Sequence, residues 1–223
     1  AEPPEAASEP EEPEQRAARG STPSDKNTDA HTEESPPMDY EVVIGLETHC
    51  ELETESKLWC GCSTKFGQAP NTQTCPVCLG MPGSLPVLNE RAFELSLRVA
   101  LALECQINQT CCFDRKNYYY PDLPKNYQIS QDYMNLGVEG ALEIPVDEGL
   151  KRVGITNVHL EEDAGKNVHA TAGADYSLVD LNRAGTPLLE IVSEPDMRSV
   201  AEAEAFMHTL RRLLMYARVS DCR

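Results

Sequence analysis

Apolar and polar residues alternate along the stretch from Tyr40 to Leu52. Because side chains in a β-strand alternate between its two faces, one face would hold a row of apolar residues, Val42, Ile44, Leu46, Cys50 and Leu52. The other face would hold Glu47, His49 and Glu51 in neighbouring same-face positions. This pattern predicts a β-strand with one apolar face and one polar face.

The polar face of this strand has two interpretations. A carboxylate and an imidazole held on a rigid strand are suited to binding a metal ion or to transferring a proton. A strand with one solvated face would show the same alternation and carry no chemistry. Both interpretations remain open for Glu47 and His49 when this stretch is taken alone.

Two helices are predicted from capping residues and helical spacing. Asn89 is a favourable N-cap for a helix that runs to about Leu103. Residues Ser199 to Glu202 form a capping box, a pattern that often begins a helix. Apolar residues then recur at helical spacing as far as Ala217. We expect this second helix to cover the apolar side of a sheet.

A second strand pattern, over residues 151–160, ends in three adjacent acids, Glu161, Glu162 and Asp163. Adjacent carboxylates repel one another unless a cation or solvent relieves the repulsion. The cluster therefore indicates either a solvated turn or a set of metal ligands. Two further strand patterns, at 176–183 and 188–194, are joined by a turn and again place polar groups on one side.

Four of the nine cysteines form two close pairs. Cys60 and Cys62 are a Cys-x-Cys pair, and Cys75 and Cys78 are a Cys-x-x-Cys pair, with twelve residues between the pairs. Two pairs complete a tetrahedral sulfur site, which favours structural zinc because four protein ligands leave no open position. A redox dithiol is the alternative, but it needs only one pair. We expect the other five cysteines to be small buried residues.

A local basic group, Arg115, Lys116 and Lys125, stands out in an otherwise acidic chain. It lies in a loop-rich segment that contains four tyrosines and is interrupted by Pro121 and Pro124. Basic side chains close to a metal-binding face could hold phosphate oxygens. A packed aromatic loop with solvated basic tips is the alternative interpretation.

The chain has 223 residues and a net charge of −18. Residues 1–37 contain ten acidic and three basic residues, seven prolines and almost no large apolar side chains. Because such a segment buries too little apolar surface to offset its ordering entropy, we expect a disordered acidic leader. The overall charge argues against a broad nucleic-acid-binding surface, although partner proteins could still hold a nucleic acid.

Membrane and export signals are not evident in the sequence. No apolar run approaches the ~20 residues that a membrane-spanning helix needs. The N-terminal residues resemble neither a secretory signal nor an Arg-rich, acid-poor transit peptide. We therefore expect no membrane contact and a cytoplasmic location in a bacterium, with an organellar location left open.

Seven ordered stretches resemble the family of B subunits of the bacterial and organellar aspartyl/glutamyl-tRNA(Asn/Gln) amidotransferases. These stretches are Val43–His49, Phe113–Tyr118, Tyr120–Lys125, Tyr127–Gln131, His159–Lys166, Leu178–Gly185 and Glu190–Asp196. The resemblance covers nearly everything from Asp39 to Arg223, and the leader lies outside it. Seven motifs in order are far more specific than any one of them alone.

The resemblance implies an α+β fold, an antiparallel-sheet cradle similar to the catalytic domain of glutamine synthetase, with helices on one face. Residues 38–223 would be the N-terminal part of this catalytic cradle domain, with the family's helical and tail domains absent. Some family members lack the four cysteines. The zinc would therefore be structural, separate from the shared chemistry and distant from the catalytic groups.

The resemblance also implies a reaction in translation. The family uses ATP to phosphorylate the side-chain carboxylate of Glu-tRNA(Gln) or Asp-tRNA(Asn). Ammonia, which the amidotransferase's A subunit releases from glutamine, then displaces the phosphate to give Gln-tRNA(Gln) or Asn-tRNA(Asn). The A and C subunits would be the partners in a heterotrimer. The sequence does not distinguish Glu from Asp as the substrate.

Site residues follow from the same resemblance. The Mg²⁺ site is expected to consist of Glu47, His49, Glu161 and Glu162. Because imidazole is an unusual ligand for a hard cation, Mn²⁺ stays open. Catalytic roles are expected for Glu47, His49, Glu162, Lys116 and Lys125, the two lysines lying near the phosphate and the ammonia path. We assign ATP binding to Arg115, Lys116, Asn182 and Arg183.

Two other functions are compatible with parts of the sequence. A zinc-stabilised interaction module without catalysis would explain the cysteines and the acidic leader, but not the polar rows on several strands. A different ATP-dependent carboxylate–amine ligase would act on a free amino acid. An assay that compares acylated tRNA with free glutamate would separate this second alternative from the family's reaction.

Overall fold

The computed structural model describes residues 39–169 and 176–222. The expected disordered leader, residues 1–37, therefore lies outside the described residues. Residues Tyr40–Arg223 form one compact unit. Within the described residues, no helix has both the length and the apolar character needed to cross a membrane.

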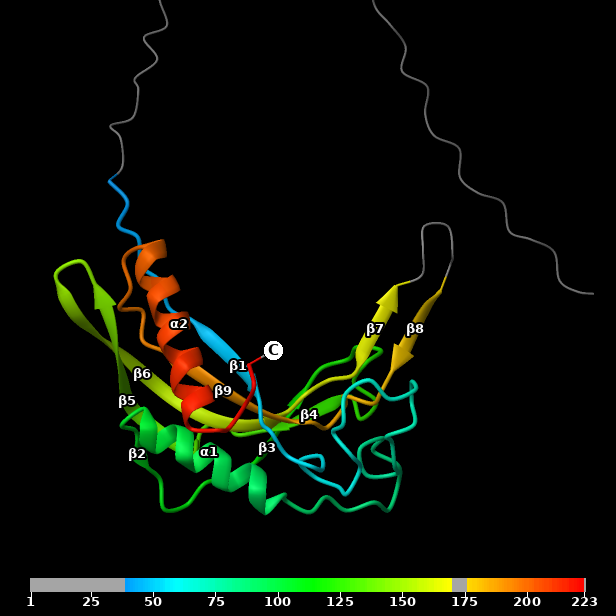
Figure 1. Ribbon diagram of the computed structural model, residues 1–223. Coiled ribbons are helices and arrows are strands. Elements are labelled where there is room, and N and C mark those ends of the chain that lie inside the picture. The colour runs from blue at the N-terminus through cyan, green and yellow to red at the C-terminus, as the bar shows by residue number, and fades with distance from the viewer. Residues whose placement is uncertain (1–38, 170–175, 223) are drawn as a thin grey trace, which may run out of the picture. The chain divides into compact units, whose positions relative to one another are not determined.

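The described part of the chain contains two helices and nine strands (Figure 1). Their bounds are β1 Glu47–Glu51, α1 Glu90–Ala102, β2 Gln106–Ile107, β3 Asp114–Asn117, β4 Tyr127–Ser130, β5 Gly137–Val146, β6 Gly149–Glu162, β7 Lys166–His169, β8 Ser177–Asp180, β9 Pro187–Ser193 and α2 Val200–Tyr216. The α+β class and the antiparallel sheet expected from the sequence are confirmed.

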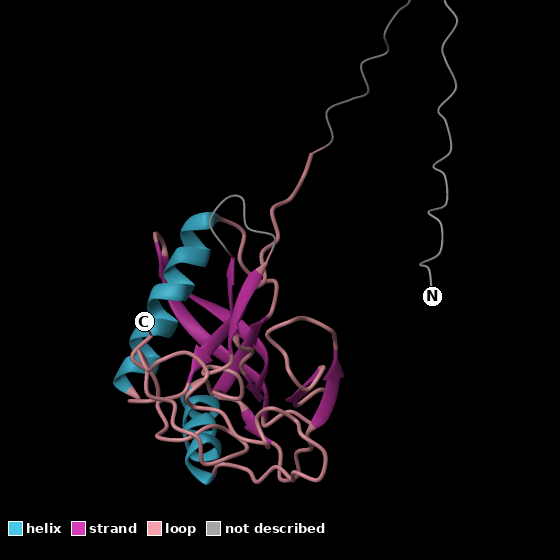
Figure 2. Ribbon diagram, turned by 90° about the vertical axis from the view of Figure 1, so that its right-hand side faces the viewer, coloured by secondary structure: helices cyan, strands magenta, loops and turns pink. Residues whose placement is uncertain are grey.

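The main sheet is antiparallel and, in the described chain, has seven strands built around β6. Five of its strands follow the order β1-β9-β6-β4-β3. β5 pairs with β6 along the edge away from β9, and β2 pairs with β5. With 14 residues, β6 is long enough to pair with β5 along most of its length and with β4 at its end. A separate two-stranded ribbon, β7–β8, stands apart from the main sheet in both views (Figures 1 and 2).

One face of the main sheet is apolar and packs on both helices. The alternation along β6 and β9 buries Val158, Leu160, Leu189 and Ile191 in one cluster. The same cluster contains residues from α1, among them Leu95, and residues from α2, Phe206, Leu210 and Leu214. Burying each such side chain contributes roughly 1.5–3 kcal/mol. The opposite face holds the polar side chains of β6, Asn157, His159 and Glu161, and on β9 it holds Glu190 between Leu188 and Val192.

The helices begin at the predicted caps. Asn89 accepts a hydrogen bond from the Ala92 amide at 3.2 Å, and the Ser199 hydroxyl accepts one from the Glu202 amide at 3.2 Å. The Glu202 carboxylate accepts the Arg198 amide at 2.7 Å and pairs with the Lys151 ammonium at 2.8 Å. The capping box thus also fastens the start of α2 to β6.

The first strand is shorter than the sequence predicts, and the two late strands belong to different sheets. β1 begins only at Glu47, because the residues before it have no partner strand except an isolated bridge between Ile44 and Met197. The strands at 176–183 and 188–194 do not pair with each other, since β8 joins β7 whereas β9 joins β1 and β6. The turn between them is held elsewhere: Gly185 donates to Asp163 and accepts from Leu58, at 2.8 and 2.9 Å.

Substitution of Gly140 should test the packing of β5 against the end of α1. A Cβ at this position would lie 2.5 Å from the Cys105 sulfur and 2.5 Å from the Leu103 carbonyl oxygen, and the carbonyl belongs to the backbone. We expect Gly140→Ala to lower the free energy of unfolding by about 1–3 kcal/mol in urea denaturation. Gly45→Ala is the matched control, because its Cβ would meet nothing closer than 3.5 Å. Equal losses in the two variants would contradict this packing.

Candidate functional site

Three side chains meet in a row across the polar face of the main sheet. Glu190 on β9 lies directly opposite His49 on β1 and His159 on β6 in the strand register. The Glu190 carboxylate is 3.2 Å from His49 Nε2 and 3.1 Å from His159 Nε2. Glu161 follows on the same face of β6, and its carboxylate lies 3.2 Å from His49 Nε2. His49 therefore bridges two carboxylates that come from different strands.

The two carboxylates of this row are buried, at 2% exposure for Glu161 and 7% for Glu190. Buried anions this close repel each other unless hydrogen bonds or positive charge compensate. The Ser130 hydroxyl donates to Glu161 at 3.2 Å. The hydrogen bond from His159, with His49 and Lys116 nearby, lowers the pKa of Glu190. These contacts favour the charged form of Glu190.

His49, Glu161 and Glu190 offer ligand atoms that lie within 4.8 Å of one another. Carboxylate oxygens are the ligands that Mg²⁺ and Mn²⁺ prefer, and imidazole suits the softer ion of the two. Three ligands leave the remaining positions of an octahedral ion to water or phosphate oxygens. The chemistry of these donors fits a divalent cation.

Two of the residues expected in this metal site lie elsewhere. Glu47 and Glu162 are paired with β9 positions five residues apart, Val192 and Pro187. At ~3.4 Å per residue, this separates them by roughly 17 Å along the strands. Adjacent residues of a strand point to opposite faces, so Glu162 turns away from the face that holds Glu161. Glu47 shares the face of His49 but lies outside the three-ligand cluster.

Glu162 forms a buried ion pair with Lys125 on the other side of the sheet. The Glu162 side chain is 2% exposed and the Lys125 side chain 6%. The Glu162 carboxylate also accepts the Ile129 amide at 2.8 Å. Burial raises the pKa of Glu162, and the Lys125 ammonium opposes that shift. Two residues predicted to be catalytic are thus brought together, but at a place separate from the His49 cluster.

The basic residues of β3 are exposed, and one of them faces the cluster. Lys116 lines the same hollow as His49 and Glu161. The Arg115 guanidinium lies over the ring of Tyr127, 5.0 Å from its centroid, and the Lys125 ammonium lies 5.4 Å from the same centroid. Lys116 thus faces the hollow, whereas Arg115 packs on an aromatic ring.

Asn182 and Arg183 bond to this chain's own backbone. The Asn182 side chain accepts the Gln73 amide at 2.8 Å and donates to the Ala69 carbonyl at 2.7 Å. The Arg183 guanidinium donates to the carbonyls of Ala164 and Gly165, at 2.9 and 2.8 Å. Both side chains thereby fix loops around the site. Neither is arranged as an open group for a nucleotide.

Asp163 completes the three-acid cluster with a different environment. Its carboxylate lies 3.2 Å from Arg183 Nε. Burial, together with the neighbouring Glu51 carboxylate, raises the pKa of Asp163 to about 7, against the opposing effect of Arg183. The three adjacent acids therefore have three separate partners: His49 for Glu161, Lys125 for Glu162 and Arg183 for Asp163.

The four paired cysteines converge. Cys60, Cys62, Cys75 and Cys78 place their sulfur atoms within 4.8 Å of one another, with Cys75 and Cys78 at 3.9 Å. A tetrahedral zinc with Zn–S bonds of ~2.3 Å requires sulfur atoms ~3.8 Å apart. Hydrogen bonding from Cys60, the Cys75 amide and the charge of Lys57 lower the pKa of Cys78 to about 4, which favours the thiolate that binds metal. The cluster thus fits a structural metal.

The cysteine cluster lies beside Lys125 and Glu162, two of the residues predicted to be catalytic, although the sequence predicts that it is distant from them. Gly80, two residues after Cys78, packs on the side chain of Lys125. The side chains of Cys78 and Glu162 both border the same backbone position, Gly185. Spacing along the sequence gave no sign of this proximity, because the cysteine loops and the Lys125–Glu162 pair meet only after β6 has folded onto β4.

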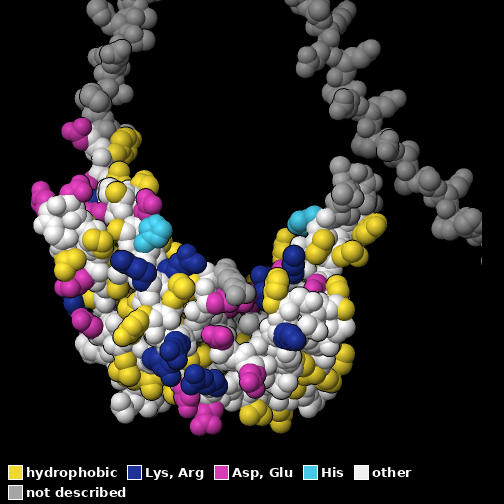
Figure 3. Space-filling view, in the orientation of Figure 1, with side chains coloured by type: hydrophobic (Ala, Val, Ile, Leu, Met, Phe, Trp, Pro, Cys, Tyr) yellow, Lys and Arg dark blue, Asp and Glu magenta, His cyan; other side chains and the backbone are white. Residues whose placement is uncertain are grey.

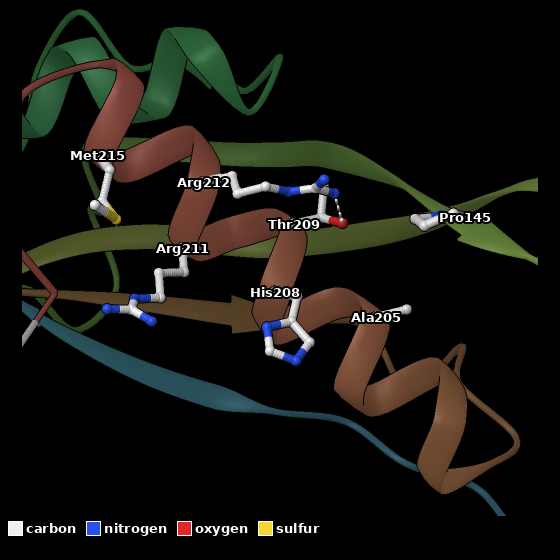
Figure 4. A pocket seen from close by; sticks show the side chains of 7 residues that line it. All are labelled: Pro145, Ala205, His208, Thr209, Arg211, Arg212 and Met215. Carbon is white, nitrogen blue, oxygen red and sulfur yellow. Dashed lines mark hydrogen bonds between the residues drawn. The ribbon is translucent and has the colours of Figure 1, made fainter.

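The His49 cluster opens into a hollow of about 970 Å³. Side chains of β1, β3, β6 and α2 line it, and acidic and basic groups follow its floor between α2 and the β7–β8 ribbon (Figure 3). A smaller hollow of about 470 Å³ lies along the outer side of α2 (Figure 4). There Arg212 donates to Thr209 at 3.2 Å, and no carboxylate is among the lining residues that the structure describes. The larger hollow is therefore the candidate site.

Two site residues were missed by the sequence-based assignment. Glu190 is the single charged residue in the otherwise apolar strand β9, and that isolation was a usable signal. His159 precedes Glu161 by two residues, so the two share one face of β6. The same two-residue spacing relates Glu47 and His49, the pair that was assigned.

Comparisons with known proteins identify the family to which the chain belongs. The family model of the GatB/GatE catalytic domain matches residues 42–223. Among curated relatives, the B subunit of the aspartyl/glutamyl-tRNA(Asn/Gln) amidotransferase of Moorella thermoacetica is 62% identical over 187 residues, which are 83% of this chain and 39% of the relative. The B subunit of the same name from Geotalea uraniireducens is 59% identical over 186 residues, 82% of this chain and 39% of the relative.

The matched region spans well under half the length of these relatives, whereas it takes in nearly all of the described chain. A family match over 182 residues and identities near 60% are decisive for membership. The motifs that carry the resemblance also lie on the strands that build the two clusters described above. The chain belongs to the family of the GatB/GatE catalytic domain.

Proposed function

We propose that this chain is the N-terminal part of the catalytic domain of a tRNA-dependent amidotransferase, acting in protein synthesis on Glu-tRNA(Gln) or Asp-tRNA(Asn). The observation that supports this most is the His49–Glu161–Glu190 cluster, of which His49 and Glu161 line the large hollow. Membership of the family supplies the reaction class, since the relatives are named for it. The A and C subunits of the amidotransferase are the proposed partners in a heterotrimer.

The chemical problem of this reaction is a poor electrophile. A carboxylate has no good leaving group, so amide formation needs activation of one of its oxygens. ATP with a divalent ion, when bound, supplies the phosphoryl group and neutralises the charge between the phosphates and the attacking carboxylate. The chain's own task is to place these charges and to keep water away from the activated acid.

The residues of the hollow divide this task. His49, Glu161 and Glu190 would hold the ion, and the burial of the two carboxylates on β6 and β9 would fix its position. Lys116, which lines the same hollow, would neutralise a phosphate oxygen. Glu47 extends the acidic face along β1, where it could contact the ion's water ligands. Asn182 and Arg183 would act indirectly, by fixing loops beside the hollow.

The Lys125–Glu162 pair would serve the second half of the reaction. When ammonia attacks the activated carbonyl, the C–N bond forms, phosphate leaves and the nitrogen must lose a proton. Glu162 lies on the other side of the sheet from the hollow, so this proton would have to reach it through intervening polar groups; a buried carboxylate whose pKa is raised by burial is suited to accept it at an oxygen atom. The Lys125 ammonium holds the ionised carboxylate in place.

The acidic surface bears on how tRNA is bound. A net charge of −18 disfavours strong binding of a polyanion by this chain alone. We therefore propose that tRNA is held largely by the partner proteins or by parts of the relatives that this chain does not contain. The zinc-stabilised module without catalysis is less well supported, since it leaves two buried, closely spaced carboxylates unexplained.

Replacing one ligand of the cluster should test the catalytic proposal. In the enzyme assembled with its partners, we expect Glu190→Gln to lower amide formation on charged tRNA by about 10²–10³-fold, because the isosteric amide removes one charge from the ion's site. Glutamine hydrolysis by the partner should persist. Added ammonia should not restore activity, because the defect precedes arrival of the nucleophile.

The control for this substitution is Glu143→Gln, an exposed carboxylate on β5 of the same sheet that takes no part in the cluster. It should retain the full rate. If free ammonia restored amide formation by the Glu190→Gln variant, Glu190 would instead be assigned to ammonia delivery. The same assay with free glutamate in place of charged tRNA tests the alternative function. A ligase that acts on a free amino acid would convert the free glutamate, whereas the tRNA-dependent enzyme would not.

The four-Cys cluster should bind one structural zinc. We propose about one equivalent per chain by elemental analysis of protein purified without chelator. Cys75→Ser should lose that zinc and lower the melting temperature, whereas Cys111→Ser, outside the cluster, should change neither. Purified, reduced wild-type protein without zinc would contradict the assignment.

A further inference from the structure

The loop that carries the second cysteine pair lies against Lys125. Gly80 adopts a positive φ of 67°, and a Cβ there would be 2.5 Å from Lys125 Cγ and 3.2 Å from Lys125 Cα. The aliphatic stem of Lys125 therefore rests directly on the bare backbone of Gly80. Backbone bonds within the loop, from the Leu79 amide to Cys75 and from the Gly80 amide to Val77, each 3.0 Å long, fix Gly80 relative to the sulfur ligands.

Lys57 joins the cysteine cluster to the same region. Its side chain is fully buried, and its ammonium donates to the Cys78 sulfur at 3.7 Å and to the Leu181 carbonyl at 3.4 Å. Among the ion pairs of the described residues, none gives Lys57 a carboxylate partner. A buried ammonium requires a compensating negative charge, and the thiolates of the cluster are the ones in contact with it. The Lys57 amide also donates to Cys62 at 2.9 Å.

Gly185 marks the point where the two groups meet. A Cβ at Gly185 would lie 3.5 Å from Cys78 Cβ, 3.5 Å from Lys57 Cδ and 3.7 Å from a carboxylate oxygen of Glu162. A ligand of the metal, the lysine beside it and the acid of the buried ion pair therefore surround one backbone position. The cysteine loop packs on Lys125 through Gly80, and Cys78 and Glu162 both lie beside Gly185.

We propose that the metal-filled four-Cys cluster is a positioning element for the Lys125–Glu162 ion pair, acting through the packing of Gly80 against Lys125. The metal joins the two cysteine loops, and the loop from Cys75 to Gly80 in turn supports the Lys125 stem. Loss of the metal frees this loop, and the ammonium of Lys125 is then no longer held at the Glu162 carboxylate. The effect on catalysis rests on the proposed function, whereas the effect on the ion pair does not.

A pair of glycine substitutions separates this contact from simple backbone strain. Gly80 and Gly83 both have positive φ, 67° and 85°, but a Cβ at Gly83 would meet nothing within 4 Å. Gly80→Ala and Gly83→Ala therefore carry similar backbone strain, and only the first displaces Lys125. Neither substitution removes a cysteine, so both variants should keep one zinc per chain.

The first measurement is independent of activity. The Ile129 amide donates to the Glu162 carboxylate, so its hydrogen exchange, followed by NMR, reports whether that carboxylate stays in place. We expect Gly80→Ala to speed exchange at Ile129 at least tenfold, with Gly83→Ala within about twofold of wild type. The Ala141 amide, bonded to Leu103 at 2.7 Å in β5, should remain unchanged in both.

The second measurement is the rate of amide formation in the assembled enzyme. Gly80→Ala should lower it about 10–100-fold at unchanged zinc content, the range typical of residues that support a site without touching the reacting atoms. Lys125→Ala is measured beside it. Should Lys125→Ala keep the full rate, the proposed role of the ion pair fails, and the exchange data still decide whether the cluster positions it.

Removal of zinc from wild-type protein by a chelator gives the final comparison. We expect faster exchange at Ile129, unchanged exchange at Ala141, and recovery when zinc is added back. Equal exchange at Ile129 in Gly80→Ala, Gly83→Ala and wild type would overturn the proposal. So would an equal rise at Ile129 and Ala141 after chelation, because the metal would then support the whole fold and not the ion pair.

Discussion

The antiparallel pairing of β6 with β9 is the constraint on which the rest of this structure depends. It places Leu160 and Leu189 on the face that packs against the helices, and Glu161 and Glu190 on the other. β1 then adds His49 opposite Glu190. One register therefore determines both the apolar core and the only three-ligand cluster of carboxylates and imidazole found in the described residues. A shift by one residue would exchange the two faces and destroy both.

Two buried clusters of charge lie on opposite sides of this sheet, and each is compensated differently. The carboxylates facing the hollow share one imidazole and remain open to an added cation. The Lys125–Glu162 pair is closed, since both side chains are almost fully buried and already bonded to each other. Phosphoryl transfer needs a site that can accept a charged ligand, whereas proton transfer benefits from one that excludes water. The sheet keeps these two environments apart while Glu161 and Glu162 remain neighbours in sequence.

Local features of this fold were predictable from the sequence, and long-range ones were not. Asn89 and Ser199 cap helices as expected, because capping depends on residues only three positions away. The cysteine pairs meet because their short spacing lets both sulfur atoms of a pair point to one centre. Which of Glu161 and Glu162 faces His49 depends on the register of β6 with β9, which includes an irregularity between Ile155 and Asn157. That irregularity reverses the alternation of buried positions along β6, so counting from its start assigns the wrong face. Glu190 could have been found as the single charge in an apolar strand, but its partners could not.

The place of β1 at the margin of the main sheet has a consequence for solubility. Within the described residues β1 pairs only with β9, so its outer row of backbone groups has no partner strand. Such a margin invites another chain to add a strand and begin aggregation. β1 is short, and its alternate residues Glu47, His49 and Glu51 are polar. Charged side chains on a short outer strand oppose pairing with a second copy. The residues that give β1 its chemistry would therefore also keep neighbouring molecules from joining their sheets.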